Sequence, residues 1–373
     1  MTKRVSYIFP ISHHFRYPFH LRLRERLAAH DVDYVVSYCA PYGANLQKND
    51  TVDIPWGHRV PLLRIGGAQL QWAPRDVLES DLVIVQQENK LLLNYPCQIL
   101  SMAGLRKVAF FGHGRNFQAA DARSPGERWK RFWATKVDWW FAYTDETRSL
   151  LSGLGFPENR ITVFNNAVDT SELSATAARV TPERLDQRRR ELGLSGHTVG
   201  VYVGGLYPDK RLAFLVSALD RIRSEVPDFE FIIAGGGPDL PFVQAAASTR
   251  PWLKVVGPRF GDEKVELMLL GSVFLIPGLV GLAILDAATL GLPTITTNYP
   301  FHSPEIAYLR DGVNGIIVRP WEDDSEYAAQ VIALLRDKRR LSAMSDAARI
   351  VGSNYTIEAM ADAFSNGVLS ALS

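Results

Sequence analysis

Two cationic side chains, Lys210 and Arg211, follow the glycine pair Gly204-Gly205 where an apolar run gives way to a helical pattern. Glycine allows close approach to the backbone, and cations at a helix start attract phosphate groups. An ordinary exposed turn can carry the same residues. Taken alone, these positions therefore leave a phosphate site and a solvated turn both open.

Histidines mark two further places where chemistry could occur. His113 follows an apolar run and lies between Gly112 and Gly114, so its ring could bond a ligand or simply cap a strand end. A second polar group follows the first apolar run of the chain and comprises His13, His14, Arg16 and Tyr17. Several such groups together favour recognition of hydroxyls or phosphate, although any single one could be an ordinary surface residue.

Signals for other chemistries are weak. The stretch Asp31-Val32-Asp33 imitates a metal-binding carboxylate pair but stands directly before a strand. Neither a GxxxxGK[ST] loop nor a GxGxxG after the first strand is present, so kinases and dinucleotide oxidoreductases lack their fingerprints. Cys39 and Cys97 offer neither a disulfide framework nor zinc-site spacing. We therefore expect no metal and no cofactor.

The elements that position these residues are short apolar runs separated by stretches of helical pattern. Strands this continuously apolar are buried on both faces, and their alternation with helices predicts parallel sheets with right-handed crossovers. The predicted strands are Arg4–Ile11, Asp33–Tyr38, Asp81–Val85, Lys107–Phe111, Trp139–Tyr143, Ile161–Phe164, Thr198–Val203, Phe229–Ala234, Leu253–Val256, Val273–Ile276, Thr294–Thr296 and Gly315–Val318.

A chain of 373 residues exceeds one comfortable core, which favours two α/β domains, each a Rossmann-like doubly wound sheet. We predict an N-terminal domain at 1–170, a linker at 171–195 leading into a polar helix, a C-terminal domain at 196–352, and a helix at 353–373 that packs back on the first domain. Ligands of open sheets lie beyond the carboxyl ends of the strands, so we expect the site in an intervening cleft.

Composition excludes several classes of protein. A net charge of +1 gives no field for nucleic acid, which we do not expect as a partner. The first apolar run is broken by Pro10 and followed by polar residues, unlike a signal peptide. The uncharged run at 267–285 contains Gly271, Pro277 and Gly278, which divide it into shorter elements. We expect a cytoplasmic protein.

Five segments of the second half, taken in order, resemble the retaining GT-B glycosyltransferases of family 4. Each segment corresponds to one landmark of that family: a GRLxxxKG loop, a strand with a glycine loop, an EGFGLxxLEA element, the turn after it, and a final pair of short motifs. In this chain they are Gly204–Arg211, Phe231–Pro238, Pro277–Ala287, Gly291–Pro293, and Pro304–Ile306 with Asp311–Gly315.

The first half resembles the same family more weakly. Val163–Thr170 is similar to the VIPNGVDT crossover, and Phe111–Asn116 falls where many members carry a histidine. The resemblance implies a GT-B enzyme, independent of metal, that moves a sugar from a nucleotide-sugar donor to a glycan or lipid-linked acceptor, as in polysaccharide assembly. A weakly catalytic sugar-nucleotide or glycan binding protein and a nucleotide-sugar epimerase are the alternatives.

Roles for individual residues follow from the resemblance and from the chemistry of glycosyl transfer. The transition state carries positive charge on the sugar and growing negative charge on the departing diphosphate. The implied catalytic residues are His113 and Lys210. The implied donor-binding residues are Gly204, Gly205, Lys210, Arg211, Gly281, Leu282, Asp286 and Glu305, with Asp286 on the ribose. The acceptor side holds His13, His14, Arg16 and Tyr17.

The chain departs from the family pattern at two glycines. Gly205 replaces an arginine, and Gly278 replaces a glutamate that holds the donor sugar. We expect Gly278 to leave room for a non-standard sugar, with Glu305 supplying a contact.

A basic aromatic stretch at 123–140 suggests one more partner. It combines Lys130 and Arg131 with several tryptophans, as in helices that lie on anionic membranes. A solvated face of an amphipathic helix is the alternative. If the membrane hypothesis holds, the protein works at the inner face of the membrane.

Overall fold

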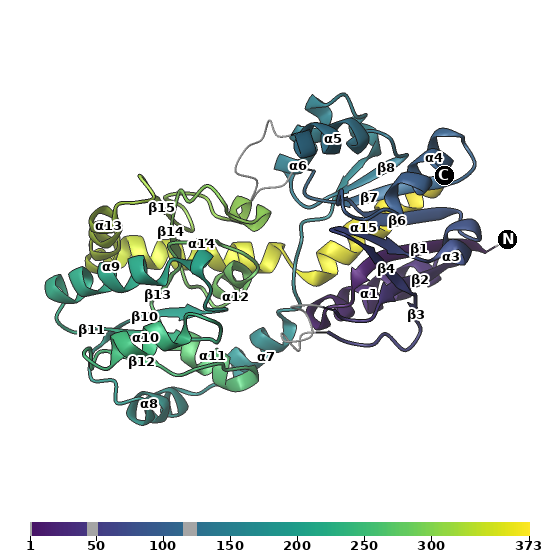
Figure 1. Cartoon of the computed structure of the whole chain (residues 1–373). Coiled ribbons are helices and arrows are strands. Elements are labelled where there is room, and N and C mark those ends of the chain that lie inside the picture. Colours follow the sequence, from purple (N-terminus) through teal and green to yellow (C-terminus); the bar gives the residue numbers. More distant parts are fainter. Residues whose placement is uncertain (1, 43–50, 115–124) are drawn as a thin grey trace. The chain divides into compact units, whose positions relative to one another are not determined.

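The computed structural model describes residues 2–42, 51–114 and 125–373, which form two compact units. The first unit comprises 1–169 together with 356–373, and the second comprises 170–355. Each unit is an α/β layer structure with a parallel sheet at its centre (Figure 1).

The first unit is built on a seven-stranded sheet in the order β3-β2-β1-β6-β7-β8-β9, with every pair parallel. Its strands are β1 (Lys3–Ile11), β2 (Val32–Cys39), β3 (His58–Arg59), β6 (Leu82–Gln86), β7 (Lys107–Gly112), β8 (Trp139–Ala142) and β9 (Ile161–Val163). Its helices are α1 (Tyr17–Ala28), α3 (Pro74–Leu78), α4 (Asn94–Met102), α5 (Pro125–Ala134), α6 (Asp145–Gly153) and α15 (Ile357–Leu372).

The second unit has a six-stranded parallel sheet in the order β12-β11-β10-β13-β14-β15. Its strands are β10 (Thr198–Val203), β11 (Phe229–Ala234), β12 (Leu253–Val255), β13 (Val273–Leu275), β14 (Thr294–Thr297) and β15 (Gly315–Val318). Its helices are α7 (Ser171–Arg179), α8 (Pro182–Glu191), α9 (Leu212–Glu225), α10 (Leu240–Ala247), α11 (Gly261–Leu269), α12 (Ala283–Thr289), α13 (Asp324–Arg336) and α14 (Lys338–Asn354).

The predicted strands are confirmed to within about two residues, because long buried runs between turn signals specify them strongly. The sequence did not predict the short strand β3 or the antiparallel hairpin β4 (Leu62–Ile65) and β5 (Ala68–Gln71). Helices α7 and α8 occupy the segment that we expected to be a linker.

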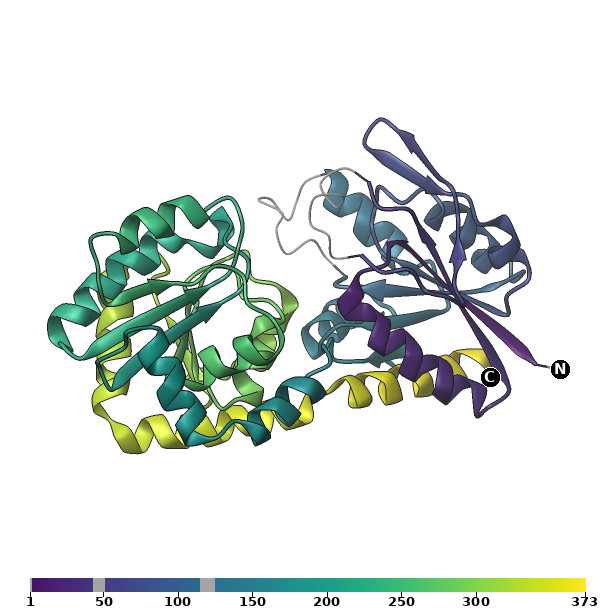
Figure 2. The same ribbon diagram turned by 90° about the horizontal axis from the view of Figure 1, so that it is seen from below.

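The C-terminal helix α15 is part of the first unit and lies beside α1 (Figure 2). Arg22 Nε of α1 donates to Glu358 Oε1 at 2.7 Å, and the ring of Phe364 stacks on Phe141 of the sheet at 3.9 Å between centroids. Because α15 covers strands β8 and β9, the first unit is incomplete without the end of the chain.

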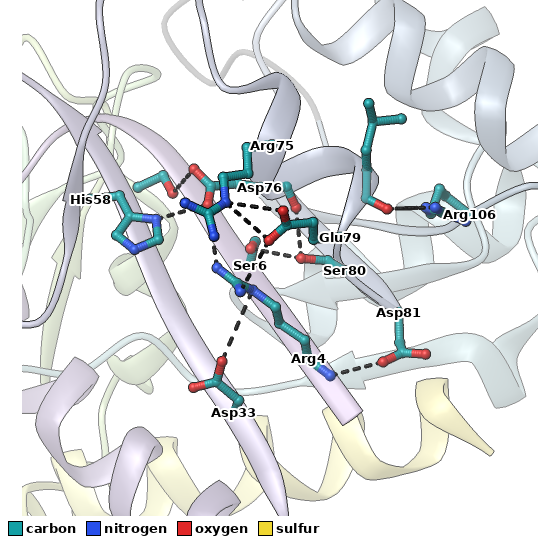
Figure 3. Close-up of polar contacts among 12 residues, drawn as sticks. Arg4, Ser6, Asp33, His58, Arg75, Asp76, Glu79, Ser80, Asp81 and Arg106 are labelled. Atoms are coloured by element: carbon teal, nitrogen blue, oxygen red, sulfur yellow. Dashed lines mark hydrogen bonds and ion pairs between the residues drawn. The ribbon is translucent and has the colours of Figure 1, made fainter. Parts of the chain in front are cut away.

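A buried carboxylate ties α3 to the sheet of the first unit (Figure 3). Asp76 accepts a hydrogen bond from Ser37 Oγ and lies 2.8 Å from His58 Nδ1. The guanidinium of Arg4 lies 3.7 Å from Asp76 and 3.4 Å from Glu79. Since a buried charge is tolerated only when it is paired and hydrogen-bonded, this cluster is a structural tie.

The uncharged run at 267–285 forms the end of α11, strand β13, a loop and the start of α12. Within residues 2–42, 51–114 and 125–373, no helix combines the length and the apolar character needed to cross a bilayer.

Candidate functional site

Two glycine loops lie against each other at the carboxyl ends of β10 and β11. Leu206 N donates to Gly236 O at 2.9 Å. A Cβ at Gly235 would lie 1.9 Å from Gly204 O, and one at Gly237 would lie 2.4 Å from Leu206 O. The glycines are therefore required by this close backbone approach, which forms one edge of the candidate site.

Lys210 lies at the end of the 3-10 turn Pro208–Lys210, which follows β10. Its Nζ donates to Leu279 O in the loop after β13, and Leu279 N donates to Asp209 O at 2.8 Å. Burial lowers the pKa of Lys210 to about 8, while Asp209 and Glu305 act in the opposite direction. The turn thus holds a partly buried ammonium group against the β13 loop, where it can meet a phosphate.

The expectation that Gly278 leaves room for a sugar is wrong. A Cβ at this position would lie 2.1 Å from Asp209 O and 2.6 Å from the carbonyl carbon of Lys210. The backbone of the Lys210 turn fills the space in which a side chain would begin. Gly278 therefore allows the turn to approach the β13 loop, and a glutamate could not be accommodated without a backbone shift.

At Gly205, where the resembled family has an arginine, the ring of Tyr207 occupies the space beside the backbone. A Cβ there would lie 2.2 Å from the ring of Tyr207, which is 45% exposed and so could move aside. Tyr202 Oη donates to Gly205 O at 2.6 Å and fixes the backbone from the buried side. An aromatic ring thus covers the place where an arginine would begin.

Arg211 was expected beside the donor phosphates, but the structure shows other partners for it. Its guanidinium lies 4.2 Å from the ring centroid of Phe214 and 4.5 Å from that of Trp321. Nη1 also donates to Trp321 O at 2.6 Å. Burial lowers the pKa of Arg211. These contacts hold the guanidinium against an aromatic cluster. The donor contact of Arg211 stays a prediction, and the phosphate site proposed below depends on Lys210.

Asp286 lies on α12, and its Oδ2 is 2.6 Å from Lys264 Nζ of α11. In the described part of the chain the other carboxylate oxygen has no hydrogen-bond partner and remains available to a hydroxyl. Just before α12, the nearest atom to a Cβ at Gly281 would be Ser303 Oγ at 3.9 Å, so there is space beside the backbone of Gly281, which Leu282 follows.

His302 was missed by the sequence analysis. It is buried, accepts a hydrogen bond from Val280 N at 3.0 Å, and lies 2.8 Å from Thr297 O through Nε2. It therefore joins the loop after β13 to the loop after β14. The available signal was a histidine between an apolar strand and the Pro304-Glu305 motif. Glu305 is itself buried, and its charge acts on Lys210.

In the first unit, His113 follows β7, and its ring lies 4.3 Å from that of Tyr143 between centroids. Burial lowers the pKa of His113 to about 3, and the charges of Lys130 and Arg16 add to the effect. The imidazole is therefore neutral at neutral pH and can offer one donor and one acceptor. Arg115 and Asn116 of the same motif lie outside the described residues.

The polar residues after β1 form a turn and the start of α1. The ring of His13 stacks on Phe15 at 5.5 Å, whereas His14 is exposed and Tyr17 is partly buried. Arg16 lies 6.0 Å from the ring centroid of Tyr143, the residue that also contacts His113. The structure thus brings Arg16 and His113 together around one tyrosine.

Helix α5 has an exposed aromatic face. The side chains of Trp129 and Phe132 are 50% and 59% exposed, and Trp129 Nε1 donates to Tyr95 Oη at 2.9 Å. Lys136 Nζ lies 5.5 Å from the ring centroid of Phe132. The first residues of the predicted basic stretch, Arg123 and Ser124, lie outside the described residues.

Two doubly wound parallel sheets, with the candidate residues at their carboxyl ends, define the GT-B architecture, as predicted. Residues 197–337 match the family model described as "Glycosyl transferases group 1". This segment is therefore similar to group 1 glycosyltransferases, in agreement with the resemblance seen in the sequence. Retention of stereochemistry and membership of family 4 remain predictions.

Curated relatives are glycosyltransferases by name. The chain is 30% identical over 216 residues to a GDP-mannose-dependent alpha-(1-6)-phosphatidylinositol monomannoside mannosyltransferase of Mycolicibacterium smegmatis, covering 54% of each protein. It is 25% identical over 189 residues to alpha-D-kanosaminyltransferase of Streptomyces kanamyceticus, covering 49% of this chain and 48% of the relative. The matches thus span about half the length of these relatives.

Solved structures show the same fold over nearly the full length of the chain. Anabaena Alr3699/HepE in complex with UDP superposes with a TM-score of 0.69 at 16% identity, covering 99% of this chain and 100% of the other. WaaG, a glycosyltransferase of lipopolysaccharide biosynthesis, gives 0.62 at 14% identity, covering 97% and 98%. At these identities the likeness shows the architecture alone.

Proposed function

We propose that this protein is a glycosyltransferase that takes a sugar from a nucleotide-sugar donor and passes it, with retention, to a hydroxyl of a glycan or lipid-linked acceptor. The observation that carries the proposal is Lys210, a partly buried ammonium held by Leu279 O within the segment that matches group 1 glycosyltransferases. The bound ligands named for Alr3699/HepE and the donor of the mannosyltransferase support a nucleotide-sugar donor.

In the proposed reaction the bond between the anomeric carbon and the β-phosphate oxygen breaks, and a bond to the acceptor oxygen forms. The products are a glycoside, a nucleoside diphosphate and the proton of the acceptor hydroxyl. Lys210 supports the charge that grows on the departing diphosphate. The backbone of Gly281 and Leu282 approaches the phosphates, Asp286 binds the ribose, and Glu305 contacts the sugar. His113, neutral at working pH, hydrogen-bonds the transferred sugar.

The test is nucleotide release from UDP-, GDP-, dTDP- and CMP-sugars, measured with and without candidate acceptors. Release that depends on acceptor supports a transferase. Release without acceptor, together with an altered sugar, would favour an epimerase. UDP-GlcNAc 2-epimerase of Neisseria meningitidis has the same architecture, with a TM-score of 0.63 at 13% identity over 98% of this chain and 99% of the other. Nucleotide binding without any release would favour a binding protein.

The donor-binding part can be tested without knowledge of the acceptor. A thermal-shift panel of the four nucleotides should identify the base, because a ligand at 100 times its dissociation constant adds about 2.7 kcal/mol of stability. Absence of a shift with every nucleotide would argue against the whole proposal.

We also propose that the first unit contacts the inner face of an anionic membrane through α5, as a peripheral protein. The exposed rings of Trp129 and Phe132 beside Lys130 and Arg131 support it. Sedimentation with vesicles containing anionic lipid should fall with salt and with reversal of both charges, Lys130→Glu and Arg131→Glu. The control is reversal at Lys338 and Arg339, which lie in the second unit. Lack of binding at low salt would reject the proposal.

A further inference from the structure

A buried histidine joins two loops behind the proposed phosphate site. The ring of His302 is 7% exposed, with Nδ1 3.0 Å from Val280 N and Nε2 2.8 Å from Thr297 O. Because Val280 N–H can only donate and the carbonyl of Thr297 can only accept, the two bonds fix the tautomer. The proton lies on Nε2, and the ring is neutral.

These two bonds hold the loop that in turn holds Lys210. Val280 directly follows Leu279, whose carbonyl accepts from Lys210 Nζ. Ser303 N donates to Val280 O at 3.1 Å, so Val280 is anchored through both its amide and its carbonyl. On the other side of the ring, Thr297 Oγ1 donates to Pro277 O at 2.7 Å. Residues 277–280 are therefore held at Pro277 by Thr297 and at Val280 by His302, and His302 also bonds Thr297.

We propose that His302 is a positioning residue for Lys210, the cation of the proposed phosphate site. By fixing Val280, His302 fixes the Leu279 carbonyl and hence the place of the Lys210 ammonium. The inference rests on the proposed function and deepens it, because it identifies what orients the proposed cation. The geometry supports it, because His302 and Lys210 bond the two ends of one peptide group. The imidazole accepts from Val280 N, and the ammonium donates to Leu279 O of the same peptide.

An imidazole suits this place because it supplies an acceptor and a donor at opposite edges of one rigid ring. Alanine removes both bonds and leaves a cavity behind the loop. Asparagine keeps an acceptor near the position of Nδ1 but cannot reach Thr297. Burial lowers the pKa of His302, and the charge of Lys210 lowers it further, so the ring stays neutral in the working range.

A merely structural histidine and a positioning histidine differ in what they do to Lys210. The charged and titratable groups that act on Lys210 or lie behind its loop are Asp209 on its own turn, Glu305 on the 3-10 turn Pro304–Tyr308, His302, and Arg211, whose Nη1 lies 3.5 Å from Pro277 O and 3.4 Å from Thr297 Oγ1. Loosening the loop admits water to the ammonium, which raises its pKa from about 8 toward the ordinary value. General loss of stability without loop movement leaves that pKa unchanged.

The experiment compares wild type with His302→Ala, His302→Asn and a matched control, Tyr327→Phe. Tyr327 is also fully buried in the second unit. Its hydroxyl donates to Ile295 O of β14 at 2.8 Å and bonds the backbone of Ile276, so the control loses buried bonds near the same strands but none to His302. The first readout is the pH dependence of acylation at Lys210, followed by mass spectrometry on the unliganded protein. The second is kcat/KM with the preferred nucleotide sugar.

We expect the Lys210 midpoint to rise by about one pH unit in His302→Ala, by less in His302→Asn, and not at all in Tyr327→Phe. We expect kcat/KM to fall about 10- to 100-fold in His302→Ala, as for small misplacements of a reacting group. An unchanged midpoint in His302→Ala, or an equal shift in Tyr327→Phe, would overturn the proposal. Since the acylation readout needs no activity, a failure of the proposed transferase function would be recognised separately by the absence of nucleotide release in wild type.

Discussion

The proposed role of Lys210 predicts an alkaline limit on activity. Burial lowers its pKa from 10.5 to about 8, so the ammonium is charged at pH 7 and largely neutral at pH 9. A neutral amine cannot support the charge of a departing diphosphate. Since kcat/KM reports groups of the free enzyme, it should fall about tenfold per pH unit above pH 8.

The same shift predicts the pH dependence of stability. Each pKa unit corresponds to about 1.36 kcal/mol, so keeping Lys210 charged in the folded protein costs up to about 3 kcal/mol, less after allowance for the exposed part of the side chain. Between pH 8 and 10.5 the unfolded chain binds more protons than the folded one, so stability rises with pH in this window. Below pH 8 the cost is present in full.

The assay is the pH profile of kcat/KM for wild type and Lys210→Arg, with urea unfolding of wild type and Lys210→Met at pH 7 and pH 10. Arginine stays charged, so its variant should lose activity but show no limb near pH 8. Lys210→Met should be the more stable protein at pH 7 and lose that advantage at pH 10. The reasoning would be refuted if kcat/KM of the wild type began to fall only near pH 10, or if the fall near pH 8 persisted in Lys210→Arg.

Three further changes test other parts of the structure. Asp286→Ala should weaken nucleotide binding by about 1.5–3 kcal/mol in calorimetry through the lost ribose bonds, and unchanged affinity would remove Asp286 from the site. Gly278→Ala should lower the unfolding free energy by about 1–3 kcal/mol, because its Cβ meets Asp209 O at 2.1 Å; wild-type stability would mean that the Lys210 turn yields easily. Asp76→Ala should cost about 2–3 kcal/mol in urea unfolding, since it removes the carboxylate that Ser37 and His58 contact and one of the partners of Arg4, and a loss below 1 kcal/mol would count against a structural role for the cluster.

The sequence alone was sufficient for the architecture and for the edge of each sheet on which chemistry-bearing residues lie. Strand runs such as Val273–Ile276 are apolar throughout, and a run of that kind bounded by turns has few other structural solutions. Residues that follow parallel strands lie at one edge of the sheet, and the structure has His113 directly after β7 and Lys210 in the turn that follows β10. These inferences succeed because they depend on local pattern and on chain direction.

What only the tertiary structure decided are contacts between residues far apart in the chain. Gly278 meets the backbone of Asp209, Arg211 lies against Trp321, and Asp286 pairs with Lys264. None of these pairs has a signature in local pattern, because each depends on how loops from different strands approach one another to within a few tenths of an ångström. The proposed role of His302 is of the same kind, since one of its bonds reaches Val280 in the loop after β13 and the other reaches Thr297 at the end of β14, and only the packed loops determine which nitrogen carries the proton.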